Sequence, residues 1–96
     1  MTRLELSEAA DADLASILSY GVEVYGEGAA EAYVESFEAA FALISDWPAA
    51  GAVHEEVRPP IRSRPHGSHR IFYDILEDRV IVQRILHQAM DVERHL

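Results

Sequence analysis

Two runs rich in β-branched residues, separated by a short polar turn, constrain the fold of this chain more than any other feature. The first run covers residues 69–76 and the second covers residues 79–86, with Glu77 and Asp78 between them. Two such runs around a tight turn predict an antiparallel β-hairpin. The C-terminal part of the chain is therefore expected to form at least two adjacent strands.

The register of this hairpin assigns each side chain to one of two faces. A tight turn pairs Ile75 with Val80, Tyr73 with Val82, Ile71 with Arg84 and His69 with Leu86. One face then carries Ile71, Ile75, Val80, Val82 and Leu86, and it is expected to pack on helices. The other face carries Phe72, Leu76, Ile81 and Ile85 among Arg70, Asp74, Gln83 and His87. Because this second face is half apolar, it needs a cover, either the C-terminal tail or another chain.

The first half of the chain predicts two amphipathic helices. Ser7 is a good N-cap for a helix over about residues 8–24, whose apolar positions recur at helical spacing. They are Leu14, Ile17, Leu18 and Gly21. The second helix covers about residues 28–47, with the stripe Tyr33, Phe37, Ala40, Phe41 and Ile44, and Pro48 ends it. Gly26 and Gly28 mark the short connection, so the two helices are expected to form an antiparallel hairpin.

The remaining segments complete an α+β domain. Residues 3–6 alternate polar and apolar side chains and predict a short strand. Residues 48–60 are expected to form a loop, residues 61–64 a strand and residues 65–67 a turn. The expected fold is one domain over residues 1–96. It comprises an N-terminal strand, the helical hairpin and then a three-stranded antiparallel sheet.

Charge is distributed unevenly along the chain. The 17 acidic residues outnumber 8 basic ones, all Arg, for a net charge of −9. Residues 1–57 carry −11, whereas residues 58–96 carry +2. The overall charge disfavours binding to nucleic acid or to anionic membranes. The absence of Cys excludes disulfides and thiolate metal sites. With no signal-peptide core and no apolar run of about 20 residues, the chain is expected in the cytosol.

Basic and imidazole side chains gather in the last 39 residues and form the candidate site. They are Arg58, Arg62, Arg64, His66, His69, Arg70, Arg84 and His87, with Tyr73 nearby. Arg side chains can bind a phosphodiester and His87 can act as general acid or base. Alternatively, these Arg residues protect a sheet edge from aggregation. Tyr73 is expected in the core, and Arg84 is expected to need an acidic partner from the helices or the tail, such as Asp91. No Walker loop, dinucleotide fingerprint or serine nucleophile motif is present, and neither a metal nor a cofactor is expected.

A set of residues spread over the whole chain forms a pattern that extends from the first helix to the last strand. The helical part of the pattern consists of Ala10, Asp13, Leu14, Ile17 and Tyr20, then Tyr33, Phe37, Phe41 and Ile44. Pro48, Gly51, Arg62, Gly67, His69, Ile71 and Tyr73 follow. The most specific block is Arg84-Ile85-Leu86-His87-x-x-Met90-Asp91. Together these residues resemble the ParE branch of the ParE/RelE superfamily of bacterial toxins.

The resemblance implies a toxin of a type II toxin–antitoxin system that inhibits DNA gyrase and is neutralised by a ParD-like antitoxin. RelE-like relatives instead cleave mRNA, which would give catalytic roles to His87 and Arg84. Gln88 after His87 and the low density of basic residues favour the ParE branch. A third possibility, suggested by the acidity, is a non-toxic binding module. The expected surface for antitoxin or target consists of Arg62, Arg64, Arg70, Phe72, Ile81, Ile85 and His87.

Overall fold

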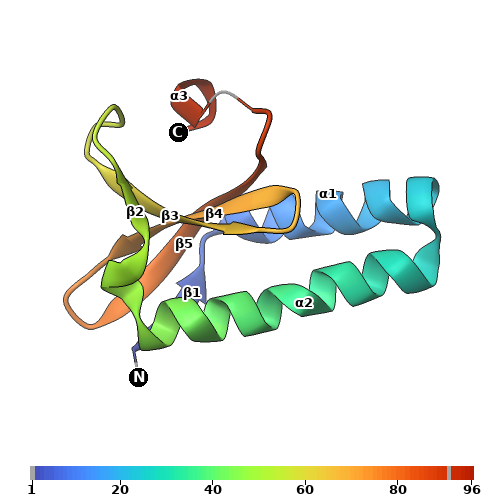
Figure 1. Cartoon of the computed structure of the whole chain (residues 1–96), viewed down its shortest axis with the longest axis horizontal. Coiled ribbons are helices and arrows are strands. Elements are labelled where there is room, and N and C mark those ends of the chain that lie inside the picture. The colour runs from blue at the N-terminus through green and yellow to red at the C-terminus, as the bar shows by residue number, and fades with distance from the viewer. Residues whose placement is uncertain (1, 91) are drawn as a thin grey trace.

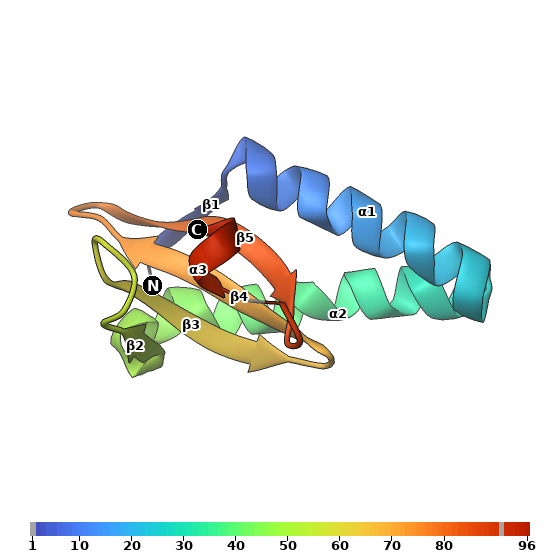
Figure 2. The ribbon, with the colours of Figure 1, turned by 90° about the horizontal axis from the view of Figure 1, so that it is seen from above.

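The computed structural model, which describes residues 2–90 and 92–96, places two long helices against one face of a five-stranded sheet (Figure 1, and Figure 2 from above). The elements in chain order are β1 (Arg3–Leu6), α1 (Glu8–Tyr25), α2 (Glu27–Asp46), the short 3-10 helix η1 (Pro48–Ala50), β2 (Ala52–His54), β3 (Ile61–His66), β4 (His69–Ile75), β5 (Arg79–His87) and α3 (Val92–His95). The strands lie in the order β1-β5-β4-β3-β2. Over the described residues, no helix combines the length and the apolar character needed to cross a membrane.

The helical hairpin forms where the sequence predicts it. Ser7 caps α1, because its Oγ accepts the Ala10 N–H at 3.0 Å, and the same hydroxyl donates to the Gln83 carbonyl of β5 at 2.9 Å. The cap therefore also joins the helix to the sheet. Gly26 alone connects the helices, with φ of 93°, a backbone conformation that glycine adopts at little cost. Helix α2 ends at Asp46, and its C-cap Trp47 immediately precedes Pro48.

The sheet contains five strands rather than the three that the sequence predicts. Strand β1 is not isolated, because it pairs in parallel with β5, from Arg3 opposite Arg79 to Leu6 opposite Val82. Strand β2 lies inside the segment expected to be a loop and pairs antiparallel with β3. A three-residue edge strand has no periodicity to detect, which is why it was missed. The turn expected at residues 65–67 is also displaced, since β3 continues to His66.

A β-bulge divides the predicted register of the β4–β5 hairpin into a correct half and a wrong half. The pairs of Ile75 with Val80 and of Tyr73 with Val82 are confirmed, but the register then shifts between Phe72 and Tyr73. Beyond the shift the pairs are Phe72 with Arg84, Ile71 with Ile85, Arg70 with Leu86 and His69 with His87. The extra residue exchanges the faces of everything after it on β5. Ile85 and His87 therefore face the helices, whereas Arg84 and Leu86 lie on the other face, the reverse of the prediction.

The helix-facing side of the sheet holds the main hydrophobic core. Its buried members are Ala10, Phe37, Ala40, Ile44, Ile71, Tyr73, Val80, Val82 and Ile85. Leu4, Leu14, Ile17, Tyr33 and Phe41 pack around them. Tyr73 is 1% exposed and donates its hydroxyl to the Pro48 carbonyl, which confirms its prediction as a core residue.

The opposite face of the sheet carries a second, smaller core under the C-terminal tail. Ile61, Phe72 and Leu86 are buried there, and Val57 and Val92 pack against them. Helix α3, drawn in red, lies across this face on the side away from α1 and α2 (Figures 1 and 2). The tail therefore supplies part of the cover that the half-apolar second face requires.

Candidate functional site

Three histidines form a row across strands β3, β4 and β5 on the helix-facing side of the sheet. His66 lies opposite His69, and His69 lies opposite His87. Side chains of directly opposite residues share a face, which brings the three imidazoles together. The ring centroids of His69 and His87 are 5.4 Å apart, with an angle of 80° between the planes. The Phe37 ring of α2 lies 4.4 Å from the ring of His66.

Tyr33 of α2 connects this histidine row to the tip of the β3–β4 hairpin. Its hydroxyl lies 2.7 Å from Nδ1 of His69 and 3.3 Å from the His66 carbonyl, and it accepts the Ser68 N–H at 3.2 Å. Ser36 Oγ, one helical turn further on, lies 2.7 Å from Nε2 of His66. The two helix residues thereby fix the positions of two imidazoles and of the turn between them.

Gly67 at this turn is expected to tolerate no side chain. Its φ is +55°, and an added Cβ would lie 2.6 Å from atoms of the Tyr33 ring. The substitution Gly67→Ala therefore combines backbone strain with a steric clash, and we expect it to lower the free energy of unfolding by about 1–3 kcal/mol. Urea unfolding followed by circular dichroism measures the change. Gly28→Ala is the matched control, because a Cβ there meets nothing within 4 Å. Equal midpoints for Gly67→Ala and wild type would contradict the prediction.

Burial lowers the pKa values of two members of the histidine row below the ordinary value of 6.5. For His66 the second cause is the nearby Arg64, and for His69 the further causes are His87 and His66, opposed by Asp13. Both imidazoles are therefore neutral in the folded chain at neutral pH. A second positive charge is disfavoured wherever two of these rings meet.

The stability of the fold is expected to fall as the pH decreases from 7.5 to 5. Because the folded pKa values of His66 and His69 lie below 6.5, the unfolded chain binds more protons over this range. Protonation of His66 and His69 therefore favours unfolding. The loss of stability begins as the pH falls to the pKa that these histidines have in the unfolded chain. Thermal unfolding at several pH values measures it. The double variant with Gln at both positions should have a flatter profile, and an unchanged slope would contradict this assignment.

An open, mostly apolar cavity lies between the helical hairpin and the ends of the strands, and we call it the hairpin cavity. Its volume is about 710 Å³. It is lined by Ser16, Ile17, Tyr20, Gly21, Tyr25, Ala29, Ala30, Tyr33, Ser68, His69, His87 and Met90. Tyr20 and Tyr25 are 64% and 71% exposed, so large aromatic surfaces are available to a partner. No Arg is among the lining residues that the structure describes.

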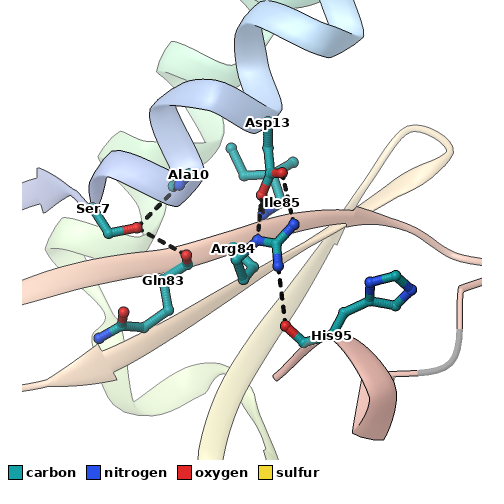
Figure 3. Close-up of polar contacts among 7 residues, drawn as sticks. All are labelled: Ser7, Ala10, Asp13, Gln83, Arg84, Ile85 and His95. Atoms are coloured by element: carbon teal, nitrogen blue, oxygen red, sulfur yellow. Dashed lines mark hydrogen bonds and ion pairs between the residues drawn. The ribbon is translucent and has the colours of Figure 1, made fainter.

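Arg84 on the other face of the sheet is held by an acid from α1, Asp13 (Figure 3). Arg84 Nε and Nη2 donate to the two carboxylate oxygens at 2.8 and 2.9 Å, and the Ile85 N–H donates to the same carboxylate at 2.9 Å. Arg84 Nη1 donates to the His95 carbonyl at 3.0 Å, which ties in the tail. The bonds from Asp13 raise the pKa of Arg84 further. A helix acid is thus the partner of Arg84; the other residue suggested, Asp91, lies outside the described residues.

The three arginines expected to act together on one surface are split between the two faces of the sheet. Arg62 and Arg64 lie opposite Tyr73 and Ile71, so they share the helix-facing side. Arg70 lies on the other side, where its Nη1 donates to Ser63 Oγ at 2.7 Å. Strand alternation causes this separation, because Arg70 belongs to the set of Phe72 and Leu86. Arg62 is already engaged, since it donates to the Ala49 and Gly51 carbonyls at 3.0 Å each.

The apolar members of the expected binding surface also separate. Ile81 lies on the second face as predicted and is partly buried. Phe72 is on that face but only 3% exposed, because the second core and the tail cover it. Ile85 is 2% exposed in the main core, so its expected position on the second face is wrong. His87 is exposed but lies beside His69 on the helix side, also contrary to prediction.

Asp13 and Tyr33 organise the site although sequence reasoning assigned them no role beyond helix positions. Asp13 carries a signal, because it lies three residues after Ala10 and four before Ile17, on the apolar stripe of α1. An acid on such a stripe requires a buried cationic partner. Tyr33 carries no comparable signal, since a tyrosine in a helical stripe is normally explained by packing. Among residues 2–90 and 92–96, no group of three or more His, Asp or Glu side chains is arranged to hold a metal ion.

Comparison with known proteins identifies the class to which this arrangement belongs. Residues 4–92 match the family model described as the ParE toxin of the type II toxin–antitoxin system parDE. The chain therefore belongs to the ParE toxin family of type II toxin–antitoxin systems.

Individual relatives agree with this assignment over the whole chain. Toxin ParE1 of Mycobacterium tuberculosis (strain CDC 1551 / Oshkosh) is 36% identical over 99% of this chain and 98% of its own length. Toxin ParE1 of Caulobacter vibrioides is 34% identical over 100% of this chain and 99% of its own. A solved structure titled "Chromosomal ParDE TA system from P. aeruginosa" superposes with a TM-score of 0.78 at 19% identity. It covers 91% of this chain and 96% of that one, and it supports the fold.

Proposed function

We propose that this chain is a toxin that acts by binding DNA gyrase and that a ParD-like antitoxin neutralises it by forming a hetero-complex. Membership of the ParE family supports the toxin role and the toxin–antitoxin context. The observation that carries the choice of a protein target is the engagement of Arg62 and Arg84 within the chain. A ribonuclease needs cationic side chains free to hold a phosphodiester.

Two of the three arginines that the ribonuclease alternative would use for phosphate, Arg62 and Arg84, are engaged within the chain, whereas the third, Arg64, lies on the helix-facing side of β3. Both carboxylate oxygens of Asp13 bind the guanidinium of Arg84, and backbone carbonyls bind Arg62. The hairpin cavity, where His69 and His87 meet, has no Arg among its described lining residues. These features favour a target recognised through apolar and aromatic contacts, as protein surfaces are.

The test is direct inhibition of gyrase by the purified chain. We expect loss of negative supercoiling of a relaxed plasmid, in proportion to the amount of toxin added. Adding the antitoxin from the same operon should restore supercoiling. If expression stops growth while gyrase supercoiling and cleavage are untouched, the proposed target is wrong. If expression without antitoxin leaves growth unaffected, the chain is a non-toxic binding module.

One observation favours the ribonuclease alternative and defines its test. His87 is exposed, and its Nδ1 accepts the Ala89 N–H at 3.1 Å, so Nε2 of the neutral ring carries a proton that can be donated. The ring of His69 lies beside it. Expression of wild type and of His87→Ala, followed by mapping of RNA ends, separates the two readings. New cleavages in wild type that disappear in the variant would establish a nuclease, and their absence in wild type would eliminate it.

A further inference from the structure

The hairpin cavity has no charged side chain among its described lining residues. Aliphatic, aromatic, hydroxyl and imidazole groups form its walls. Its volume of about 710 Å³ lies within the range of roughly 300–1,000 Å³ that is typical of small-molecule sites. Such sites combine apolar walls with a few polar groups that orient the ligand. The hydrogen-bonding state of the two imidazoles therefore decides what the cavity can bind.

His87 presents an N–H donor rather than an acceptor. The Ala89 N–H donates to its Nδ1 at 3.1 Å, so Nδ1 holds a lone pair and the ring hydrogen lies on Nε2. Because Nδ1 is occupied, Nε2 is the ring nitrogen that remains for a ligand. The residue lines the cavity and is exposed, so a ligand can reach this donor.

His69 presents the same kind of donor, because Tyr33 fixes its tautomer. The Tyr33 hydroxyl lies 2.7 Å from Nδ1 of His69 but 3.3 Å from the His66 carbonyl. Hydroxyl donors bond at about 2.5–3.0 Å, so the hydroxyl hydrogen points to Nδ1, and the oxygen accepts the Ser68 N–H. Burial lowers the pKa of His69, so the ring is neutral at pH 7.5 and its one hydrogen lies on Nε2.

The two donors lie close enough to share one acceptor. The ring centroids of His69 and His87 are 5.4 Å apart, and both rings line the cavity. A carbonyl oxygen has two lone pairs and can accept from two N–H groups. The imidazoles therefore match a ligand whose polar end is an acceptor.

The apolar part of the cavity extends from the histidines along the two helices. Figures 1 and 2 show α1 and α2 continuing past the tip of the β3–β4 hairpin toward their connection. Gly21 and Ala30 bring the helices close together, since a Cβ added at Gly21 would lie 3.0 Å from the Ala30 Cβ. Ile17, Tyr20 and Met90 also line this part. A ligand with an apolar body can lie against these side chains.

The absence of charge from the described lining selects an uncharged ligand. An anion would meet no Arg or Lys there, and the net charge of −9 repels it. A cation would meet no carboxylate in that lining, and the two imidazole N–H groups present their positive ends to it. Transfer of either ion from water into such a cavity is costly.

We propose that the hairpin cavity is a binding site for a small uncharged molecule with an aromatic or aliphatic body and a carbonyl group, whose oxygen accepts hydrogen bonds from Nε2 of His69 and of His87. The body lies along Ile17, Gly21 and Ala30, between the helices. The inference stands independently of the proposed gyrase inhibition, because it depends only on the chemistry of the cavity.

Three probes with the same body and different head groups test the choice of ligand. They are 4-phenylbutan-2-one, 3-phenylpropionate and the ammonium form of 4-phenylbutan-2-amine, which are neutral, anionic and cationic. Each is titrated into the whole chain at pH 7.5 while the imidazole ¹⁵N signals are followed by NMR. We expect the ketone to bind with a Kd on the order of 1 mM and to shift the Nε2 signals of His69 and His87. The two ions should bind at least about tenfold more weakly.

Variants of the lining locate the bound probe. His87→Phe removes one donor at an exposed position, and we expect it to weaken ketone binding about fivefold, as for the loss of one hydrogen bond. Ser16→Trp fills the cavity from an exposed position of α1 and should weaken binding at least about tenfold. Ala39→Trp adds the same side chain at an exposed position of α2 outside the cavity, and it should bind like wild type. Thermal unfolding confirms that each variant is folded.

The possible results separate clearly. Saturable ketone binding that exceeds that of both ions and weakens in His87→Phe and Ser16→Trp supports the proposal. Binding of an ion as tight as that of the ketone overturns the choice of an uncharged ligand. Equal affinity of Ser16→Trp and wild type shows that the probe binds elsewhere, which overturns the site. Absence of saturable binding by the ketone also overturns it. None of these failures affects the proposed function, which is tested by gyrase supercoiling.

Discussion

Replacing Asp13 by Ala is expected to lower the free energy of unfolding by about 2–3 kcal/mol. The Asp13 carboxylate accepts three hydrogen bonds, two from Arg84 and one from the Ile85 N–H. The Arg84 and Asp13 side chains are only 27% and 15% exposed, so water replaces these bonds poorly. Removal of the acid leaves a partly buried cation and an unsatisfied backbone donor. Chemical denaturation with urea measures the loss.

A double-mutant cycle separates this pair from general damage to the helix. Arg84→Met removes the cation and keeps much of the aliphatic stem. We expect the variant with both Asp13→Ala and Arg84→Met to lose about 1–2 kcal/mol less stability than the sum of the two single losses. Asp11→Ala is the control, because Asp11 is exposed in the first turn of α1 and contributes mainly through the helix dipole. Strictly additive effects of the two substitutions would show that the pair contributes nothing of its own.

Replacing Phe72 by Ala is expected to cost about 3–4 kcal/mol, an effect as large as for a residue of the main core. Phe72 is 3% exposed between Ile61, Leu86 and the His54 ring, whose centroid lies 5.3 Å away. The substitution opens a cavity under α3 and should also release the tail, because Val92 packs against this cluster. Thermal unfolding measures the stability, and hydrogen exchange of the α3 amides measures the tail.

The result distinguishes a second core from an exposed docking face. Leu76 is 41% exposed next to the β4–β5 turn, so Leu76→Ala should cost no more than about 1 kcal/mol and serves as the matched control. A Phe72→Ala variant with wild-type stability and weaker binding to the antitoxin would instead make Phe72 the binding residue that its sequence position suggests.

The helical half of the fold was predictable because its signals are local. Ser7, Gly26 and Pro48 delimit the helices through capping, positive φ and the loss of a backbone donor, and each acts within a few residues. The β4–β5 hairpin was predictable for the same reason as far as Tyr73. The pairing of β1 with β5 was not, because it joins segments from the two ends of the chain.

The register beyond Tyr73 could not be obtained from the pattern of β5. Residues 80–82 and 85–86 are apolar on both faces, so hydrophobic alternation does not reveal where an extra residue enters the strand. The bulge at this place reverses the faces of Arg84, Ile85, Leu86 and His87. Most errors about the candidate site, including the position of Ile85, follow from this one insertion.

The Arg-rich pattern of the strands predicts a charged region but does not reveal what its arginines bind. The separation of Arg70 from Arg62 follows from the alternation of side chains between the two faces of paired strands. It could have been predicted from the sequence if β3 had been assigned as far as His66. The hydrogen bonds from Arg62 to the Ala49 and Gly51 carbonyls could not be predicted from the sequence, because they depend on how η1 packs beside the sheet. Most of the net charge of −9 lies on the two long helices.

The parallel pairing of β1 with β5 has a consequence for biosynthesis. Arg3 through Leu6 have no strand neighbour until residues 79–82 have been made and have left the ribosome. The main core cannot close earlier either, because Val80, Val82 and Ile85 belong to it. The complete sheet therefore forms only after nearly the whole chain has been translated. Closing so long a loop is also entropically costly, which slows this step. A nascent chain interrupted before β5 therefore exposes the acidic helices but not the complete domain.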